Sequence, residues 1–139
     1  MAPQAPLLGR GALRAAVYVG GLIATAAGLD TVVRGVKSLP GEGKLAKPVV
    51  ESELRFYAAF YAAYGLAALR VAPRADQDTT AVPALAGALF LAGMARIAGW
   101  CVAGRPHPAQ LALLTFELTT PPLIIASQRR LAAARPRAS

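Results

Sequence analysis

Two opposite charges, Arg96 and Glu117, lie within stretches that are otherwise apolar. A charge in the middle of a membrane-spanning helix costs about 2.5–3.5 kcal/mol, so each should face the protein interior and have a partner. Both residues lie about ten positions from the turn signal at residues 105–108. At a rise of about 1.5 Å per residue, two antiparallel helices would place them at the same depth. The spacing therefore predicts an ion pair within the membrane.

This ion pair has three interpretations that the sequence leaves open. It locks two helices together without a ligand, it binds a polar ligand headgroup or substrate, or Glu117 transfers protons. Pro121 and Pro122 follow directly after Glu117. Because proline lacks a backbone donor, they should kink the helix there. A kink beside a buried charge favours a polar cavity, although packing alone would also account for it.

A second group of charges is predicted where the first two apolar segments meet. Asp30 and Arg34 lie four positions apart near the end of the first segment, and Glu53 and Arg55 open the second. Because these segments should form a hairpin, the four residues are candidates for a site in the outer leaflet. The alternative is structural. Glu51 and Arg55 would pair on one helix face, and early carboxylates would suit the positive helix end.

Aromatic residues form a stripe along the second segment. Phe56, Phe60 and Tyr64 recur every four positions, with Tyr57 and Tyr61 beside them. Such a stripe is typical of helix packing and of an interfacial aromatic belt. It is also a candidate lining for a lipid chain or polyisoprenoid, and Tyr57, Tyr61 and Tyr64 are therefore candidate ligand-binding residues.

His107 is the only histidine and Cys101 the only cysteine. His107 lies between two prolines in the third turn, where a headgroup contact is a candidate role, but a lone histidine lacks the other ligands of a metal site. The motifs of serine hydrolases, phosphate-binding loops, zinc peptidases and dithiol enzymes do not occur in the sequence. We therefore predict no catalytic residue, no metal and no cofactor, and we favour a protein that is not an enzyme.

Four helices must position these residues. We expect them over residues 12–34, 53–72, 79–104 and 108–128, followed by a basic tail over 129–139. A spanning helix needs about 20 mostly apolar residues. The second segment has only 14 uncharged residues between Arg55 and Arg70, whose long side chains can snorkel to the interfaces. Residues 81–95 and 109–116 lack the polar face of a soluble helix. The predicted fold is an all-α four-transmembrane-helix bundle, a single domain over residues 1–139.

Composition and charge agree with a membrane protein. Charged residues make up 16% of the chain, against about 25% in soluble domains. The net charge is +8, but the basic residues flank apolar segments, which favours anionic lipid headgroups over nucleic acid. Lys and Arg are slightly more numerous at the termini and in the second loop, so both termini are predicted in the cytoplasm. An uncleaved first helix is favoured over a signal peptide because its apolar character continues to Val33.

Small residues recur at every fourth position in two of the predicted helices. Such rows allow helices to pack closely, either within a bundle or against a partner. They are Gly20, Ala24 and Gly28 in the first helix, and Ala95, Gly99 and Ala103 in the third.

Several motifs together resemble a known family. These are Glu-Leu-Arg-Phe-Tyr at residues 53–57, Tyr-Gly at 64–65, Gly-Met-Ala-Arg at 93–96, Gly-Arg-Pro-His-Pro at 104–108 and Glu-Leu at 117–118. They resemble an uncharacterised family of small bacterial integral membrane proteins, described as a domain of unknown function. The resemblance extends from the first helix to Gln128. It implies a four-helix protein of the bacterial plasma membrane and implies no reaction.

The leading functional hypothesis is a small accessory or scaffold protein of the plasma membrane. It would dock to a larger membrane enzyme or transporter, or hold a lipid-like molecule. The alternative is a small intramembrane enzyme or carrier for a lipid, isoprenoid or sterol-like substrate, acting through Arg96 and Glu117. A homo-oligomeric proton or ion pathway through Glu117 ranks below both. The expected partners are membrane lipids, a larger membrane protein complex or further copies of the chain, and not nucleic acid.

Overall fold

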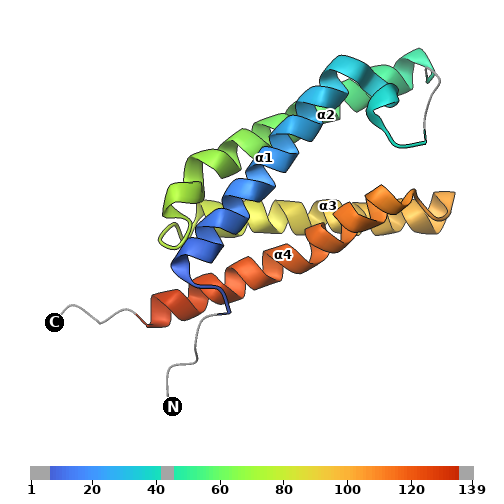
Figure 1. Ribbon diagram of the computed structural model, residues 1–139. Coiled ribbons are helices and arrows are strands. Elements are labelled where there is room, and N and C mark those ends of the chain that lie inside the picture. Colours follow the sequence, from blue (N-terminus) through green and yellow to red (C-terminus); the bar gives the residue numbers. More distant parts are fainter. Residues whose placement is uncertain (1–6, 42–45, 135–139) are drawn as a thin grey trace. The chain divides into compact units, whose positions relative to one another are not determined.

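The computed structural model describes residues 7–41 and 46–134, and these contain helices and no strand (Figure 1). The predicted all-α, four-helix fold is confirmed. Part of the predicted basic loop and tail, including Lys44, Arg135 and Arg137, lies outside the described residues. In chain order the elements are α1 (Arg10–Arg34), the 3-10 turn η1 (Gly35–Ser38), α2 (Pro48–Val71), the 3-10 turn η2 (Ala72–Arg74), α3 (Ala81–Ala103) and α4 (Pro108–Ala133).

Two helices are longer than the sequence predicted. α2 begins at Pro48 and not at residue 53, because proline suits the first helical position, where its fixed φ fits and no donor is needed. α4 continues to Ala133, so Arg129 and Arg130 belong to the helix and not to a tail. α1 and α3 end at glycines with positive φ, Gly35 at 59° and Gly104 at 90°, a region in which other residues are disfavoured.

Three of the four helices are long and apolar enough to cross a membrane. These are α1 with its η1 extension, α3 and α4. α2 is not among them, although we predicted that it spans with Arg55 and Arg70 reaching the two interfaces. Large apolar side chains are exposed on these helices, among them Leu22 and Leu91, and Val102 is 89% exposed. Such surfaces suit contact with lipid and are expensive in water.

The chain forms two compact units, Tyr18–Arg70 and the segments that flank it. In the first unit α1 and α2 cross closely. A Cβ on Gly28 would lie 2.5 Å from the backbone nitrogen of Ala62, and one on Gly65 would lie 2.7 Å from the carbonyl oxygen of Gly21. The predicted small-residue row of α1 therefore packs against α2 of the same chain. Gly21 lies in this contact, where the sequence predicted Gly20.

In the second unit α3 and α4 form a hairpin joined by residues 104–107. Its core includes Val82 and Leu89 of α3 and Leu114 and Ile124 of α4, all buried. Leu13, in the first turns of α1, is fully buried in the chain. The second small-residue row, on α3, is exposed, and a Cβ on Gly99 would meet no described atom within 4 Å.

Candidate functional site

The predicted ion pair is present inside the α3–α4 hairpin. Nε of Arg96 lies 2.7 Å from Oε2 of Glu117. Glu117 is only 1% exposed, whereas the Arg96 side chain is 35% exposed. The carboxylate is therefore enclosed, and the guanidinium reaches outward from it. The two backbones can approach here because Gly93, one turn before Arg96, carries no side chain toward Leu118 of α4.

A third residue, Gln110, completes this group. Nη1 of Arg96 donates a hydrogen bond to Oε1 of Gln110. The sequence reasoning missed Gln110, although its spacing of seven from Glu117 places both on one face of α4. We call Arg96, Gln110 and Glu117 the hairpin polar site.

Several polar groups of the hairpin polar site have no hydrogen-bond partner among the described residues. One of them is Oε1 of Glu117, which is buried. Nη2 of Arg96 and the amide nitrogen of Gln110 also have none within the described chain. The backbone carbonyl of Glu117 lacks its usual helical donor, because residue 121 is a proline and has no N–H. The site thus has spare hydrogen-bonding capacity beyond what the ion pair uses.

The second predicted group of charges, at the meeting of the first two helices, does not form one cluster. Asp30 and Arg34 form an exposed ion pair at 3.3 Å. Arg55 pairs with Glu51, with 3.5 Å between Nε and Oε2. Glu53 is exposed and makes no ion pair with any described residue. The structural alternative, a Glu51–Arg55 pair on one helix face, is therefore present.

The Glu51–Arg55 pair completes the end of α1. Nη1 of Arg55 donates to the carbonyl oxygens of Val32, at 2.5 Å, and Val33, at 2.9 Å. The backbone N–H of Val36 donates to Oε2 of Glu51 at 3.4 Å. The two side chains thus form hydrogen bonds with backbone groups at the helix end that lack intrahelical partners.

The remaining candidates lie on α2 and at the start of α4. The rings of Tyr61 and Tyr64 stack with centroids 6.3 Å apart. Tyr57 is exposed and meets Phe56 edge to face at 5.4 Å. His107 is exposed and caps α4, because its Nδ1 accepts a hydrogen bond from the backbone N–H of Ala109 at 3.2 Å. This cap gives His107 a structural role at the turn.

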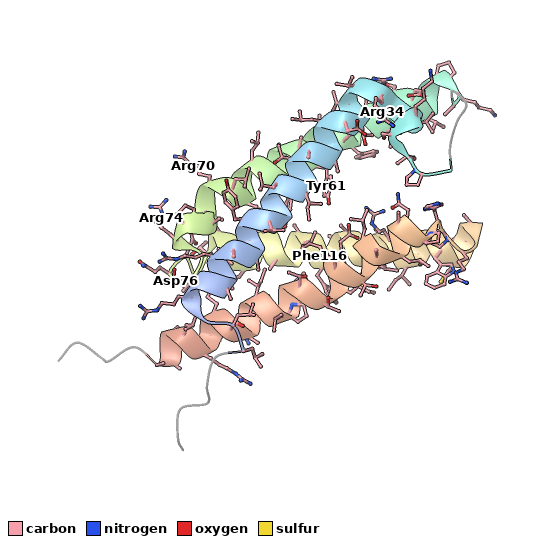
Figure 2. All side chains as sticks on the ribbon, in the orientation of Figure 1. Arg34, Tyr61, Arg70, Arg74, Asp76 and Phe116 are labelled. Carbon is pink, nitrogen blue, oxygen red and sulfur yellow. The ribbon has the colours of Figure 1, made fainter. Side chains whose placement is uncertain are left out.

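A cluster that the sequence did not predict surrounds Asp76, in the link between α2 and α3. Figure 2 shows Asp76 and Arg74 in this link. Asp76 is buried, and its Oδ1 accepts a hydrogen bond from Nε of Arg14 at 2.7 Å. Nε of Arg10 lies 3.9 Å from Oδ2. The hydrogen bond from Arg14 lowers the pKa of Asp76 below its usual value, although burial opposes the shift.

Gln128 of α4 and Asp78 of the link itself also form hydrogen bonds with backbone groups of this link. Nε2 of Gln128 donates to the carbonyl oxygens of Ala75, at 2.7 Å, and Asp78, at 2.6 Å. The Asp78 carboxylate accepts from the backbone N–H groups of Ala81 and Thr80, which lowers the pKa of Asp78. The Asp76 cluster therefore ties together the start of α1, this link and the end of α4.

No group of three or more His, Cys, Asp or Glu side chains within residues 7–41 and 46–134 could hold a metal ion. The Cys101 side chain is exposed on α3.

The fold and the hairpin polar site define an all-α protein with helices of membrane-spanning length and an ion pair enclosed between two of them. The chain belongs to the DUF4345 family, a domain of unknown function, which matches residues 12–128. The predicted membership of an uncharacterised family is thereby confirmed. No curated protein matches the chain, and no solved structure does.

Proposed function

We propose that this protein is a small accessory protein of the bacterial plasma membrane that holds a lipid-like molecule at the hairpin polar site. The observation that carries this proposal is the pair of spare donors, Nη2 of Arg96 and the amide nitrogen of Gln110, which have no hydrogen-bond partner among the described residues. In lipid no water can satisfy such groups, so leaving them unpaired is costly. A bound molecule with a polar head would use the spare capacity.

The surface beside Arg96 suits an apolar chain. Gly99 and Trp100 lie one turn further along α3, on the same side of the helix as Arg96. The space around Gly99 is open, and Trp100 is exposed. A hydrocarbon chain can lie over the glycine and against the indole ring while its polar head reaches the guanidinium.

The membrane arrangement has four spans and both termini in the cytoplasm. α2 has 24 residues, or about 36 Å at 1.5 Å per residue, which exceeds a hydrocarbon core of about 30 Å. Arg55 and Arg70 then reach the two interfaces. With four spans, the start of α1, the α2–α3 link and the end of α4 face the same side. In the sequence this side carries 8 Lys and Arg residues and the opposite side 6, so the positive-inside rule favours the cytoplasm for this side by a small margin.

Native mass spectrometry of the protein, extracted gently from its own membrane, tests the proposal. We expect a reproducible lipid mass on the wild type that is lost in Glu117→Gln and in Arg96→Gln. Glu53→Gln makes the same chemical change at an exposed carboxylate and should keep the lipid. Wild-type protein without a lipid, or equal retention in all variants, would overturn the proposal.

Docking to a larger membrane enzyme or transporter is a second candidate function, favoured by the exposed row Ala95, Gly99 and Ala103 on α3. The corresponding row of α1 is covered by α2, whereas this one is open. Further copies of the chain would fit the same row. Copurification of a stoichiometric protein partner, lost in Gly99→Leu, would support docking. The intramembrane enzyme or carrier alternative uses the hairpin polar site and differs by turnover of the bound molecule.

A further inference from the structure

We propose that the molecule held at the hairpin polar site carries a phosphate headgroup, bound by Arg96 and Gln110 with Arg105 beside them. This inference rests on the proposed function and names the chemistry of its ligand. Three features of the hairpin support it: the depth of the guanidinium, the kind of hydrogen-bonding groups left over, and the charge around them.

The guanidinium of Arg96 lies nearer the membrane surface than its backbone does. Arg96 is seven residues before the end of α3 at Ala103, or about 10 Å along the helix. Its Nη1 nevertheless bonds to Gln110, which lies two residues after the start of α4, or about 3 Å from the hairpin end. The side chain therefore extends toward the interface, as long basic side chains do in membranes. Lipid headgroups lie at this level.

The spare groups at this level are donors. Arginine has only N–H donors, and its Nη2 is unused by the described residues. Because Arg96 can only donate, the Gln110 atom that it contacts is the amide oxygen, so the amide nitrogen remains free to donate. Because Nδ1 of His107 accepts a hydrogen bond, its Nε2 is free to donate. The ligand must therefore supply acceptors.

The charge at this end of the hairpin favours an anion. Glu117 neutralises Arg96, and its carboxylate is enclosed behind the guanidinium. Arg105 in the connecting loop is exposed and forms no ion pair with a described residue. The sequence has no acidic residue from 104 to 116. One uncompensated positive charge thus lies in the loop at this end of the hairpin.

A phosphate group fits these donors better than a carboxylate does. Its oxygens point in different directions and can accept from more than one donor, and hydrogen bonds from a guanidinium to a phosphate are strong because both groups are charged. A neutral headgroup would leave Arg105 unpaired. Phosphate can come from a lipid or from free inorganic phosphate, and the surface around Gly99 and Trp100 favours the lipid.

The test compares ligands added to the delipidated full-length protein in detergent, with thermal shift and native mass spectrometry as readouts. The probes are phosphatidic acid, diacylglycerol with the same chains, and inorganic phosphate. We expect phosphatidic acid to bind and to raise the melting temperature, and diacylglycerol and inorganic phosphate to do so at least about tenfold more weakly.

Gln110→Glu separates binding from folding. A carboxylate at this position still accepts from Arg96, so the fold should persist, but it removes the amide donors and repels phosphate. We expect an affinity loss of about tenfold or more, with the melting temperature of the lipid-free protein unchanged. Arg105→Gln should also weaken binding. Arg129→Gln, an exposed arginine at the end of α4, is the control and should not.

The outcomes distinguish this inference from the proposed function. Equal binding of diacylglycerol and phosphatidic acid would overturn the phosphate headgroup and leave the lipid site in place. Inorganic phosphate binding as strongly as phosphatidic acid would overturn the lipid source. If neither lipid binds and no lipid copurifies with the wild type, the proposed function fails as well.

Discussion

Gly93 of α3 and Glu117 of α4 lie face to face, and a Cβ added to Gly93 would be 3.1 Å from the Cβ of Glu117. It would also be 2.8 Å from Cδ2 of Leu118. Close contact between the two helices at this point brings the enclosed carboxylate within reach of Arg96. The glycine therefore sets the geometry of the hairpin polar site without contributing a polar group.

Replacing this glycine should separate the two helices. We expect Gly93→Ala to be less stable than Gly99→Ala by about 1–3 kcal/mol, because overpacking has about that cost. Both changes share the gain in helix propensity, and only Gly93 faces another helix. Unfolding followed by circular dichroism in detergent micelles measures the difference. Equal stabilities would show that α4 moves aside without cost.

The two charges of the ion pair can be removed singly and together. We expect Arg96→Gln to cost about 3–5 kcal/mol in the free energy of unfolding, because it leaves the buried carboxylate of Glu117 unpaired. Glu117→Gln should cost less, because the Arg96 side chain that it leaves unpaired is 35% exposed. The double variant should recover much of this stability. Under the proposed function it should fold and still fail to retain the lipid. A double variant that recovers both stability and lipid would make the pair purely structural.

Enlarging the two small-residue rows should have opposite effects on folding. Gly28→Leu should prevent close packing of α1 on α2, since even a Cβ would lie 2.5 Å from a backbone nitrogen of Ala62. Gly99→Leu should fold normally, because no described atom lies within 4 Å of the added Cβ. Size-exclusion profiles in detergent compare the two. Aggregation of Gly99→Leu alone would contradict this assignment.

The Asp76 cluster should make stability depend on acid pH. The usual pKa of Asp76, 3.8, is lowered in the folded protein. Its ion pair with Arg14 therefore stabilises the fold fully above pH 3.8, and this contribution is lost as the pH falls through the lowered value. We expect Asp76→Asn to cost about 1–3 kcal/mol near pH 6.

The difference between wild type and Asp76→Asn should shrink as the pH falls below about 4. Chemical unfolding at a series of pH values from neutral to acid measures it, and Asp30→Asn, at an exposed ion pair, is the control. A difference that stays constant across this range would mean that Asp76 is protonated in the folded protein or stabilises it without its charge.

The helices and the Arg96–Glu117 pair could be predicted from the sequence because both follow from the high free-energy cost of placing polar or charged groups in lipid. A charge in an apolar segment requires a partner, and the equal spacing from the turn identified it. Gln110 was missed because an uncharged amide near a helix end has little cost and needs no partner. The start of α2 was placed too late because the carboxylates of Glu51 and Glu53 indicated a helix start there, whereas the helix begins at Pro48.

The Asp76 cluster could not have been predicted in this way. Arg14, Asp76 and Gln128 come from three distant segments, and their meeting depends on how the helices of one unit pack. A short acidic link between basic flanks was visible in the sequence. Its usual interpretation, a solvated loop, does not apply to a buried carboxylate. Long-range polar contacts of this kind need the tertiary structure.

The bonds from Arg55 to the last turn of α1 have a consequence for biosynthesis. The carbonyl of Val33 receives its side-chain donor from a residue 22 positions later in the chain. A ribosome adds about 5–20 residues per second, so this end of α1 waits about one to four seconds for that donor. Until then water must bond to that carbonyl, as it does at other helix ends. The end of α1 should therefore take its final form only after Arg55 has been made, and a chain truncated before Arg55 should lack it.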